Sequence, residues 1–130
     1  MNDTYLEYQA EILRMTDRDP KRCMICGKCT ASCPAFSEMD FHPHQIVGMV
    51  ERCEFDVLET VEGLWHCMSC MACSERCPRD VQPARFMDAV RQWRIRKQGG
   101  EHLHPQQVPE KIDEATPQQA IAAAFRKYRK

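Results

Sequence analysis

Long apolar runs are missing from this sequence. No stretch approaches the roughly 18 consecutive apolar residues of a membrane span, and the N-terminal segment lacks the basic region and apolar core of a secretory signal. We therefore expect a cytoplasmic protein with no direct membrane span. Disulfides do not persist in that reducing compartment, so the cysteines are expected to bind metal or to take part in a reaction.

The chain also lacks a large net charge and the motifs of common enzyme classes. Its 18 Lys and Arg residues nearly balance 19 Asp and Glu residues, giving a formal charge of -1, so bulk charge gives no reason to expect nucleic acid as a partner. The G-x-G-x-x-G, G-x-x-x-x-G-K-[ST] and G-x-S-x-G motifs are all absent. We therefore predict no catalytic residue in this chain.

Cysteine, in contrast, is abundant and regularly spaced. The 130 residues include nine cysteines, and the pattern C-x2-C-x2-C-x3-C-P occurs twice, with the second copy displaced by 44 positions. The first copy contains Cys23, Cys26, Cys29, Cys33 and Pro34, and the second contains Cys67, Cys70, Cys73, Cys77 and Pro78. The ninth cysteine, Cys53, lies outside both copies.

This spacing is typical of proteins that bind two iron–sulfur clusters. A cubic 4Fe-4S cluster takes four thiolates, and in two-cluster ferredoxins the last cysteine of each run ligates the cluster of the other run. The predicted ligands are Cys23, Cys26, Cys29 and Cys77 for cluster 1, and Cys67, Cys70, Cys73 and Cys33 for cluster 2. A four-ligand zinc site would leave cysteines over in each copy, so zinc and a disulfide framework are the weaker alternatives.

Other side chains near the cysteines receive simpler interpretations. Large apolar residues in and beside the two runs are expected to bury the clusters and so tune their reduction potentials; they are Ile25, Phe36, Trp65, Met68 and Met71. Cys53 falls on an apolar stripe with Ile46, Met49 and Val50, which favours a small buried hydrophobe over a redox thiol or an extra ligand. The histidines are expected at the surface or in packing, because the cysteines already satisfy both clusters.

Outside the cysteine runs, apolar residues recur three or four positions apart, as in helices. We expect an N-terminal helix within 1–19, a cluster-binding domain over 20–98, a linker over 99–116 and a docking helix over 117–130. Pro43 and Pro83 suit the first turns of helices, and Phe86, Ala89, Val90 and Trp93 share a face of the helix that follows Pro83.

The two terminal helices have apolar faces of their own. Thr4 and Glu7 form a candidate capping box in the N-terminal helix, where one face carries Leu6, Ala10 and Leu13. In the C-terminal helix the apolar face consists of Ile121, Ala124, Phe125 and Tyr128, and we expect it to contact a partner chain.

Charge is unevenly distributed between two further segments. Residues 82–98 carry five basic side chains and one acidic one, whereas residues 38–62 carry seven acidic side chains and one basic one. Both patterns are typical of solvated faces. The alternative is that these faces dock electron-transfer partners of opposite charge.

Residues 20–98 closely resemble the iron–sulfur C subunit of heterodisulfide reductases. The resemblance rests on RCMICGKCTASCPAF, on HPHQIVGMVERCEFDVLE and on LWHCMSCMACSERCPRDV. It implies an alpha-helical ferredoxin domain, the fold shared by the iron–sulfur subunits of succinate dehydrogenases and of anaerobic glycerol-3-phosphate dehydrogenases. The expected fold is therefore mainly α: a domain that binds two 4Fe-4S clusters, with helical extensions at both ends.

The resemblance also implies a function in anaerobic metabolism. In that family the C subunit relays electrons between a flavin-containing A subunit and a catalytic B subunit that reduces a disulfide. We therefore expect a non-catalytic electron-transfer subunit of an oxidoreductase complex. Two alternatives remain: the iron–sulfur subunit of a membrane-associated quinone-linked dehydrogenase, and a structural metal-binding interaction module.

Overall fold

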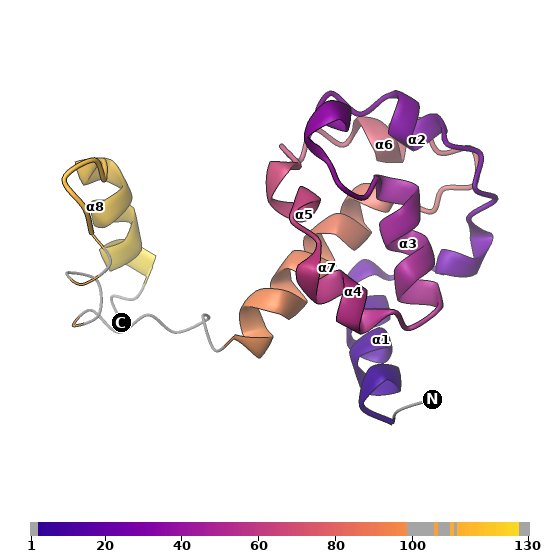
Figure 1. Cartoon of the computed structure of the whole chain (residues 1–130), viewed down its shortest axis with the longest axis horizontal. Coiled ribbons are helices and arrows are strands. Elements are labelled where there is room, and N and C mark those ends of the chain that lie inside the picture. The colour runs from indigo at the N-terminus through magenta and orange to yellow at the C-terminus, as the bar shows by residue number, and fades with distance from the viewer. Residues whose placement is uncertain (1–2, 99–105, 107–109, 111, 128–130) are drawn as a thin grey trace. The chain divides into compact units, whose positions relative to one another are not determined.

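A computed structural model describes residues 3–98, 106, 110 and 112–127 of the chain (Figure 1). Every regular element among these residues is helical, which confirms the mainly α fold. The longer helices are α1 (Asp3–Thr16), α3 (Pro43–Glu51), α4 (Phe55–Thr60), α7 (Pro83–Lys97) and α8 (Gln118–Lys127). The short ones are η1 (Pro20–Arg22), α2 (Lys28–Ala31), η2 (Phe36–Glu38), α5 (Gly63–His66) and α6 (Ala72–Glu75).

The chain divides into two compact units, Met1–Arg94 and Ile95–Lys130. The first unit contains both cysteine runs, and the second contains α8. None of the helices in the described part of the chain is both long enough and apolar enough to cross a membrane.

The core of the first unit is built on α3 and α7. Helix α3 buries Ile46, Val47, Met49 and Val50, and α7 buries Phe86, Met87, Ala89, Val90 and Trp93. Proline stands at the first position of each helix, as predicted, because its fixed φ suits the first turn and its missing N–H needs no partner there. Both predicted apolar faces are therefore confirmed.

Helix α1 packs only in part through the predicted face, of which Leu13 contacts the core. Leu6 and Ala10 are exposed, whereas Tyr5 and Tyr8 contact Phe55, with ring centroids 5.7 and 5.5 Å apart. Tyr8 also lies 5.2 Å from Trp93 in an edge-on arrangement. Tyrosine rings bury more apolar area than the Leu and Ala side chains, and this decides which face packs. The helix begins at Asp3, so Thr4 lies inside it and not at its cap.

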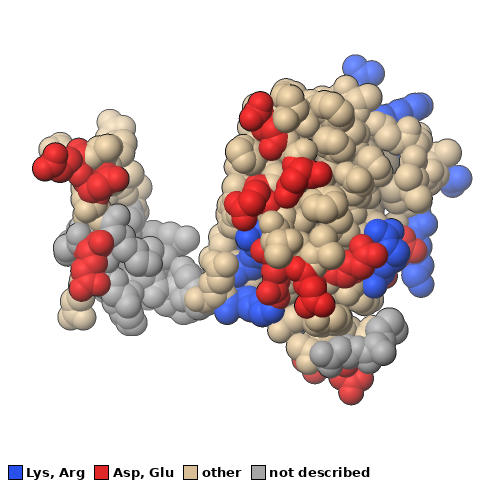
Figure 2. Space-filling view, in the orientation of Figure 1, with Lys and Arg blue, Asp and Glu red and all other residues tan. Residues whose placement is uncertain are grey.

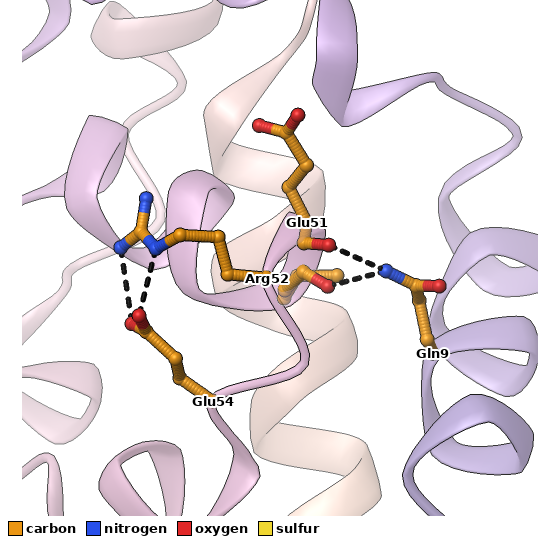
Figure 3. A network of polar contacts seen from close by, with 5 residues as sticks. Gln9, Glu51, Arg52 and Glu54 are labelled. Carbon is orange, nitrogen blue, oxygen red and sulfur yellow. Dashed lines mark hydrogen bonds and ion pairs between the residues drawn. The ribbon is translucent and has the colours of Figure 1, made fainter. Parts of the chain in front are cut away.

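Gln9 joins α1 to the end of α3 (Figure 3). Its Nε2 donates to the carbonyl oxygens of Val50 and Glu51 at 2.7 and 2.9 Å. These are carbonyls of the last helical turn, which have no partner within the helix. Beside them, Arg52 forms a bidentate ion pair with Glu54.

Helix α8 covers Gln118–Lys127, close to the predicted 117–130. Ile121 is half-buried. The side chains of Ala124 and Phe125, together with Tyr128 and most of the predicted linker, lie outside the described residues. A docking role for this helix stays a prediction.

Candidate metal centres

The two cysteine runs form loops with the same backbone conformation. Ile25 and Ser69 have φ angles of 54° and 55°, and Gly27 and Met71 have φ angles of 72° and 62°. Each pair is separated by the 44 positions of the sequence repeat. The left-handed region is open to glycine but costs other residues energy. The repeat in sequence is therefore also a repeat in backbone structure.

Each loop runs directly into a one-turn helix, and the two helices pack together. Gly27 precedes α2 and Met71 precedes α6, and these helices carry the third cysteine of each run. Contact between α2 and α6 brings the two loops side by side, although they are far apart in sequence (Figure 1).

The eight repeated cysteines surround two cavities. Cys33, Cys67, Cys70 and Cys73 line one cavity of about 340 Å³, counting the open space at its mouth. Cys23, Cys26, Cys29 and Cys77 line the other, of about 320 Å³. Each lining takes three cysteines from one run and one from the other. Among the described residues no three Cys, His, Asp or Glu side chains form a group that could hold a single metal ion.

The cysteines differ in burial, and burial acts on their ionisation. All nine thiols are free; Cys29 and Cys73 are buried, and Cys26 and Cys70 are exposed. Burial, with a smaller contribution from Cys67, raises the pKa of Cys73 to about 11, and burial also raises the pKa of Cys29. A thiol with a raised pKa is mostly protonated at neutral pH, and a bound cation favours its thiolate form. Clustered thiols of this kind fit iron, whose clusters are held by thiolates.

The predicted apolar cover over these cavities is wrong. The exposed fractions are 72% for Ile25, 50% for Phe36, 46% for Trp65, 63% for Met68 and 51% for Met71. Both loops lie at the surface of the unit, and their side chains extend into solvent. Met68 and Met71 line one cavity and remain exposed, so they form an open apolar rim and not a closed lid.

Asp40 ties the two cysteine runs together, which no pattern in the sequence predicts. Its carboxylate accepts backbone N–H groups of Glu62 at 3.0 Å and Gly63 at 2.7 Å, just before the second run, and that of Phe41 at 2.8 Å. Burial opposes ionisation, but these N–H groups more than offset it and lower the pKa of Asp40. A Cβ on Gly63 would lie 2.5 Å from Asp40 Oδ1, so this contact needs glycine.

Arginines of α7 hold the segment that leads into the second run. Arg91 donates to the carbonyl oxygens of Leu64 (2.6 Å) and Cys67 and to Ser69 Oγ (3.2 Å). Arg94 is buried and donates to the carbonyl oxygen of Val61. Neither arginine is part of a solvated basic face. The predicted solvated face of residues 82–98 is therefore wrong for Arg91 and Arg94. Spacing along a helix cannot tell whether an arginine reaches a carbonyl or water.

The described histidines lie in packing positions or, like His66, at the surface, as predicted. His44 lines the cavity of Cys23, Cys26, Cys29 and Cys77, and its Nδ1 lies 2.6 Å from Thr30 Oγ1. Burial lowers the pKa of His44. His42 stacks on Phe36, with ring centroids 4.4 Å apart. His102 and His104 fall outside the described part of the chain.

Comparison with known families identifies the cysteine-rich segment. Residues 19–81 match the family described as "4Fe-4S dicluster domain". The match spans just under half of the chain. The segment includes all eight repeated cysteines and Asp40, whereas Arg91 and Arg94 of α7 lie beyond it. The dicluster domain agrees with the thiol chemistry of the two cavities and confirms the prediction of iron–sulfur binding.

Several curated relatives of the dicluster domain are named as C subunits of heterodisulfide reductases. The C subunit of the ferredoxin:CoB-CoM heterodisulfide reductase of Methanosarcina acetivorans is 41% identical over 66% of this chain and 36% of the relative. The C subunit of the same name in Methanosarcina mazei is 31% identical over 67% of this chain and 53% of the relative. The C subunit of the H(2):CoB-CoM heterodisulfide,ferredoxin reductase of Methanothermobacter thermautotrophicus is 37% identical over 53% of this chain and 36% of the relative. The predicted resemblance is confirmed, and the chain spans about a third to a half of the length of these relatives.

Proposed function

We propose that this chain is an electron-transfer subunit that holds two 4Fe-4S clusters and catalyses no reaction on its own. The observation that carries the proposal is the grouping of eight cysteines around two cavities, within a segment that matches the dicluster family. Bound clusters of this type accept and donate electrons singly.

The proposed ligands follow the two cavity linings. Cluster 1 takes Cys23, Cys26, Cys29 and Cys77, and cluster 2 takes Cys67, Cys70, Cys73 and Cys33. Packing of α2 against α6 supports this crossed arrangement, because each loop then contributes a thiolate to its neighbour's cluster.

The proposed partners are a flavin-containing A-type subunit and a catalytic B-type subunit of a heterodisulfide reductase-like complex. Support comes from the relatives, whose names make them C subunits of such enzymes. Exposed Cys26 and Cys70, beside exposed Ile25 and Met68, supply surfaces where a redox partner could approach a cluster closely. The chain would then relay electrons to a disulfide that another subunit reduces.

The isolated, anaerobically prepared chain tests the relay. We expect it to accept electrons from dithionite and to pass them to an artificial acceptor such as a viologen or ferricyanide, without reducing a disulfide substrate. Reduction of the disulfide by this chain alone would contradict the proposal. Co-purification of the native complex distinguishes the two possible electron-transfer complexes. A-type and B-type subunits would support the heterodisulfide reductase-like complex, whereas subunits of a quinone-linked dehydrogenase would contradict it.

A further inference from the structure

Arg91 is held between α7 and the loop of the second cysteine run. It is half-buried, and its guanidinium donates to three acceptors on that loop and on α5: the carbonyls of Leu64 and Cys67 and the hydroxyl of Ser69. Cys67 is a proposed ligand of cluster 2, and Ser69 has a strained φ of 55°. The planar fork of arginine suits several acceptors at fixed angles.

All three acceptors are neutral, so none of them compensates the charge of Arg91. Among the described residues no carboxylate forms an ion pair with it, whereas its neighbour Arg94 lies 3.7 Å from Glu62. A half-buried cation is costly unless something nearby compensates it. The Arg91 guanidinium does bond the carbonyl of Cys67, whose thiol lines the cavity of cluster 2 and becomes a thiolate when a cluster is bound.

We propose that Arg91 is a positioning residue of cluster 2 that also raises its reduction potential. This inference rests on the proposed function. Arg91 lies behind the loop and not in the cavity lining, so it acts through the Cys67 peptide and through its charge. Adding one electron makes a cluster more negative, and a fixed positive charge nearby favours that reduced state.

The cations beside the first loop, Lys21, Arg22 and Lys28, are exposed. Within the described part of the chain, no arginine donates to the carbonyl of Cys23, the residue that corresponds to Cys67, and the Thr30–His44 contact ties this loop to α3. Arg79 lines the cavity of cluster 1, but it is exposed, so water and salt screen its charge. Arg91 bonds to the second loop and to α5, so we expect its effect mainly at cluster 2.

Potentiometric titration of the full-length chain, followed by electron paramagnetic resonance, tests this directly. Dithionite supplies the electrons, and the signal altered by Cys70→Ser identifies cluster 2. Arg91→Gln should lower the midpoint potential of cluster 2 and leave that of cluster 1 unchanged. Arg91→Lys keeps the positive charge, so its midpoint potential for cluster 2 should lie between that of the Gln variant and that of the unaltered chain. The matched control is Arg85→Gln on the same helix, whose guanidinium donates to the Thr16 carbonyl at 3.3 Å.

Each outcome bears on the inference. Loss of cluster 2 alone in Arg91→Gln, with half of the iron retained, would support the positioning role. Unchanged potentials in Arg91→Gln, equal shifts in the Gln and Lys variants, or equal damage to both clusters would overturn it. An unaltered chain that binds no iron–sulfur cluster would instead defeat the proposed function itself.

Discussion

Cys53 occupies a backbone position that normally favours glycine. It follows α3 with a φ of 57°, and the N–H of Glu54 donates to the carbonyl of Met49 at 2.9 Å, as in a Schellman motif. Its side chain is buried and packs in the core, as the apolar stripe predicted. This cysteine therefore ends a helix and fills space at a strained position.

Replacement of Cys53 should leave both metal centres intact. We expect Cys53→Ala to retain all iron and to lower the free energy of unfolding by about 1 kcal/mol through lost packing. The free energy of unfolding of Cys53→Gly should be closer to that of the unaltered protein, because glycine relieves the strain of the positive φ. Iron analysis and anaerobic chemical unfolding measure both effects. Loss of a whole cluster in Cys53→Ala would show that this thiol is a ligand.

Asp40 has a role that depends on two neighbouring backbone groups. Asp40→Ala removes the acceptor of the N–H groups of Glu62 and Gly63 and should lower the free energy of unfolding by about 1 kcal/mol, because water can replace the exposed bond. Cluster 2 should be lost before cluster 1, because Asp40 joins the segments that carry Cys33 and Cys67. Timed iron release after mild denaturant measures this order. The matched control is Glu38→Ala, which removes an exposed carboxylate bonded to Ser37. Equal losses of unfolding free energy and of iron in the two variants would contradict the role of Asp40.

At the scale of elements, regular patterns were predictable and loop geometry was not. Proline positions and apolar spacing located α3 and α7, because buried helix faces repeat every three or four residues. The exposure of Ile25 and Met68 was missed, since apolar composition does not tell whether a loop faces the core. Arg91 was missed for a related reason, because its acceptors are carbonyls from a distant part of the chain.

The pairing of the two cysteine runs is testable at this scale. Cys77→Ser should damage the cluster held by Cys23, Cys26 and Cys29, because Cys77 lines that cavity. Cys33→Ser should damage the cluster held by Cys67, Cys70 and Cys73. Signals assigned by electron paramagnetic resonance distinguish the two. The crossed arrangement is wrong if each substitution affects the cluster of its own run.

The charge of the first unit departs from the predicted pair of faces at Arg91 and Arg94. In Figure 2 acidic side chains lie across the face of the first unit that is drawn, and basic side chains lie along the edge near α2. Lys21, Arg22 and Lys28 beside the first loop are exposed, whereas Arg91 and Arg94 of α7 bond to backbone carbonyls. The exposed basic charge therefore includes residues beside a cysteine run.

The C-terminal segment is expected to serve assembly. Helix α8 has ten residues, which is too short to be stable alone in water, so it must pack on something to persist. Deleting residues 101–130 should leave iron content unchanged, because the cysteines and core lie in the first unit, and should weaken binding to partner subunits. Iron analysis and anaerobic co-purification measure the two effects. A truncated chain that loses iron, or that assembles as tightly as before, would argue against this role.

Quantification of iron, acid-labile sulfide and zinc in the anaerobically purified chain tests the central claim most directly. Two cubic clusters held by the eight repeated cysteines require about eight iron and about eight sulfide per chain. About four of each would mean that one of the two cavities holds no cluster. Stoichiometric zinc without sulfide would contradict the iron–sulfur assignment and the electron-transfer function built on it.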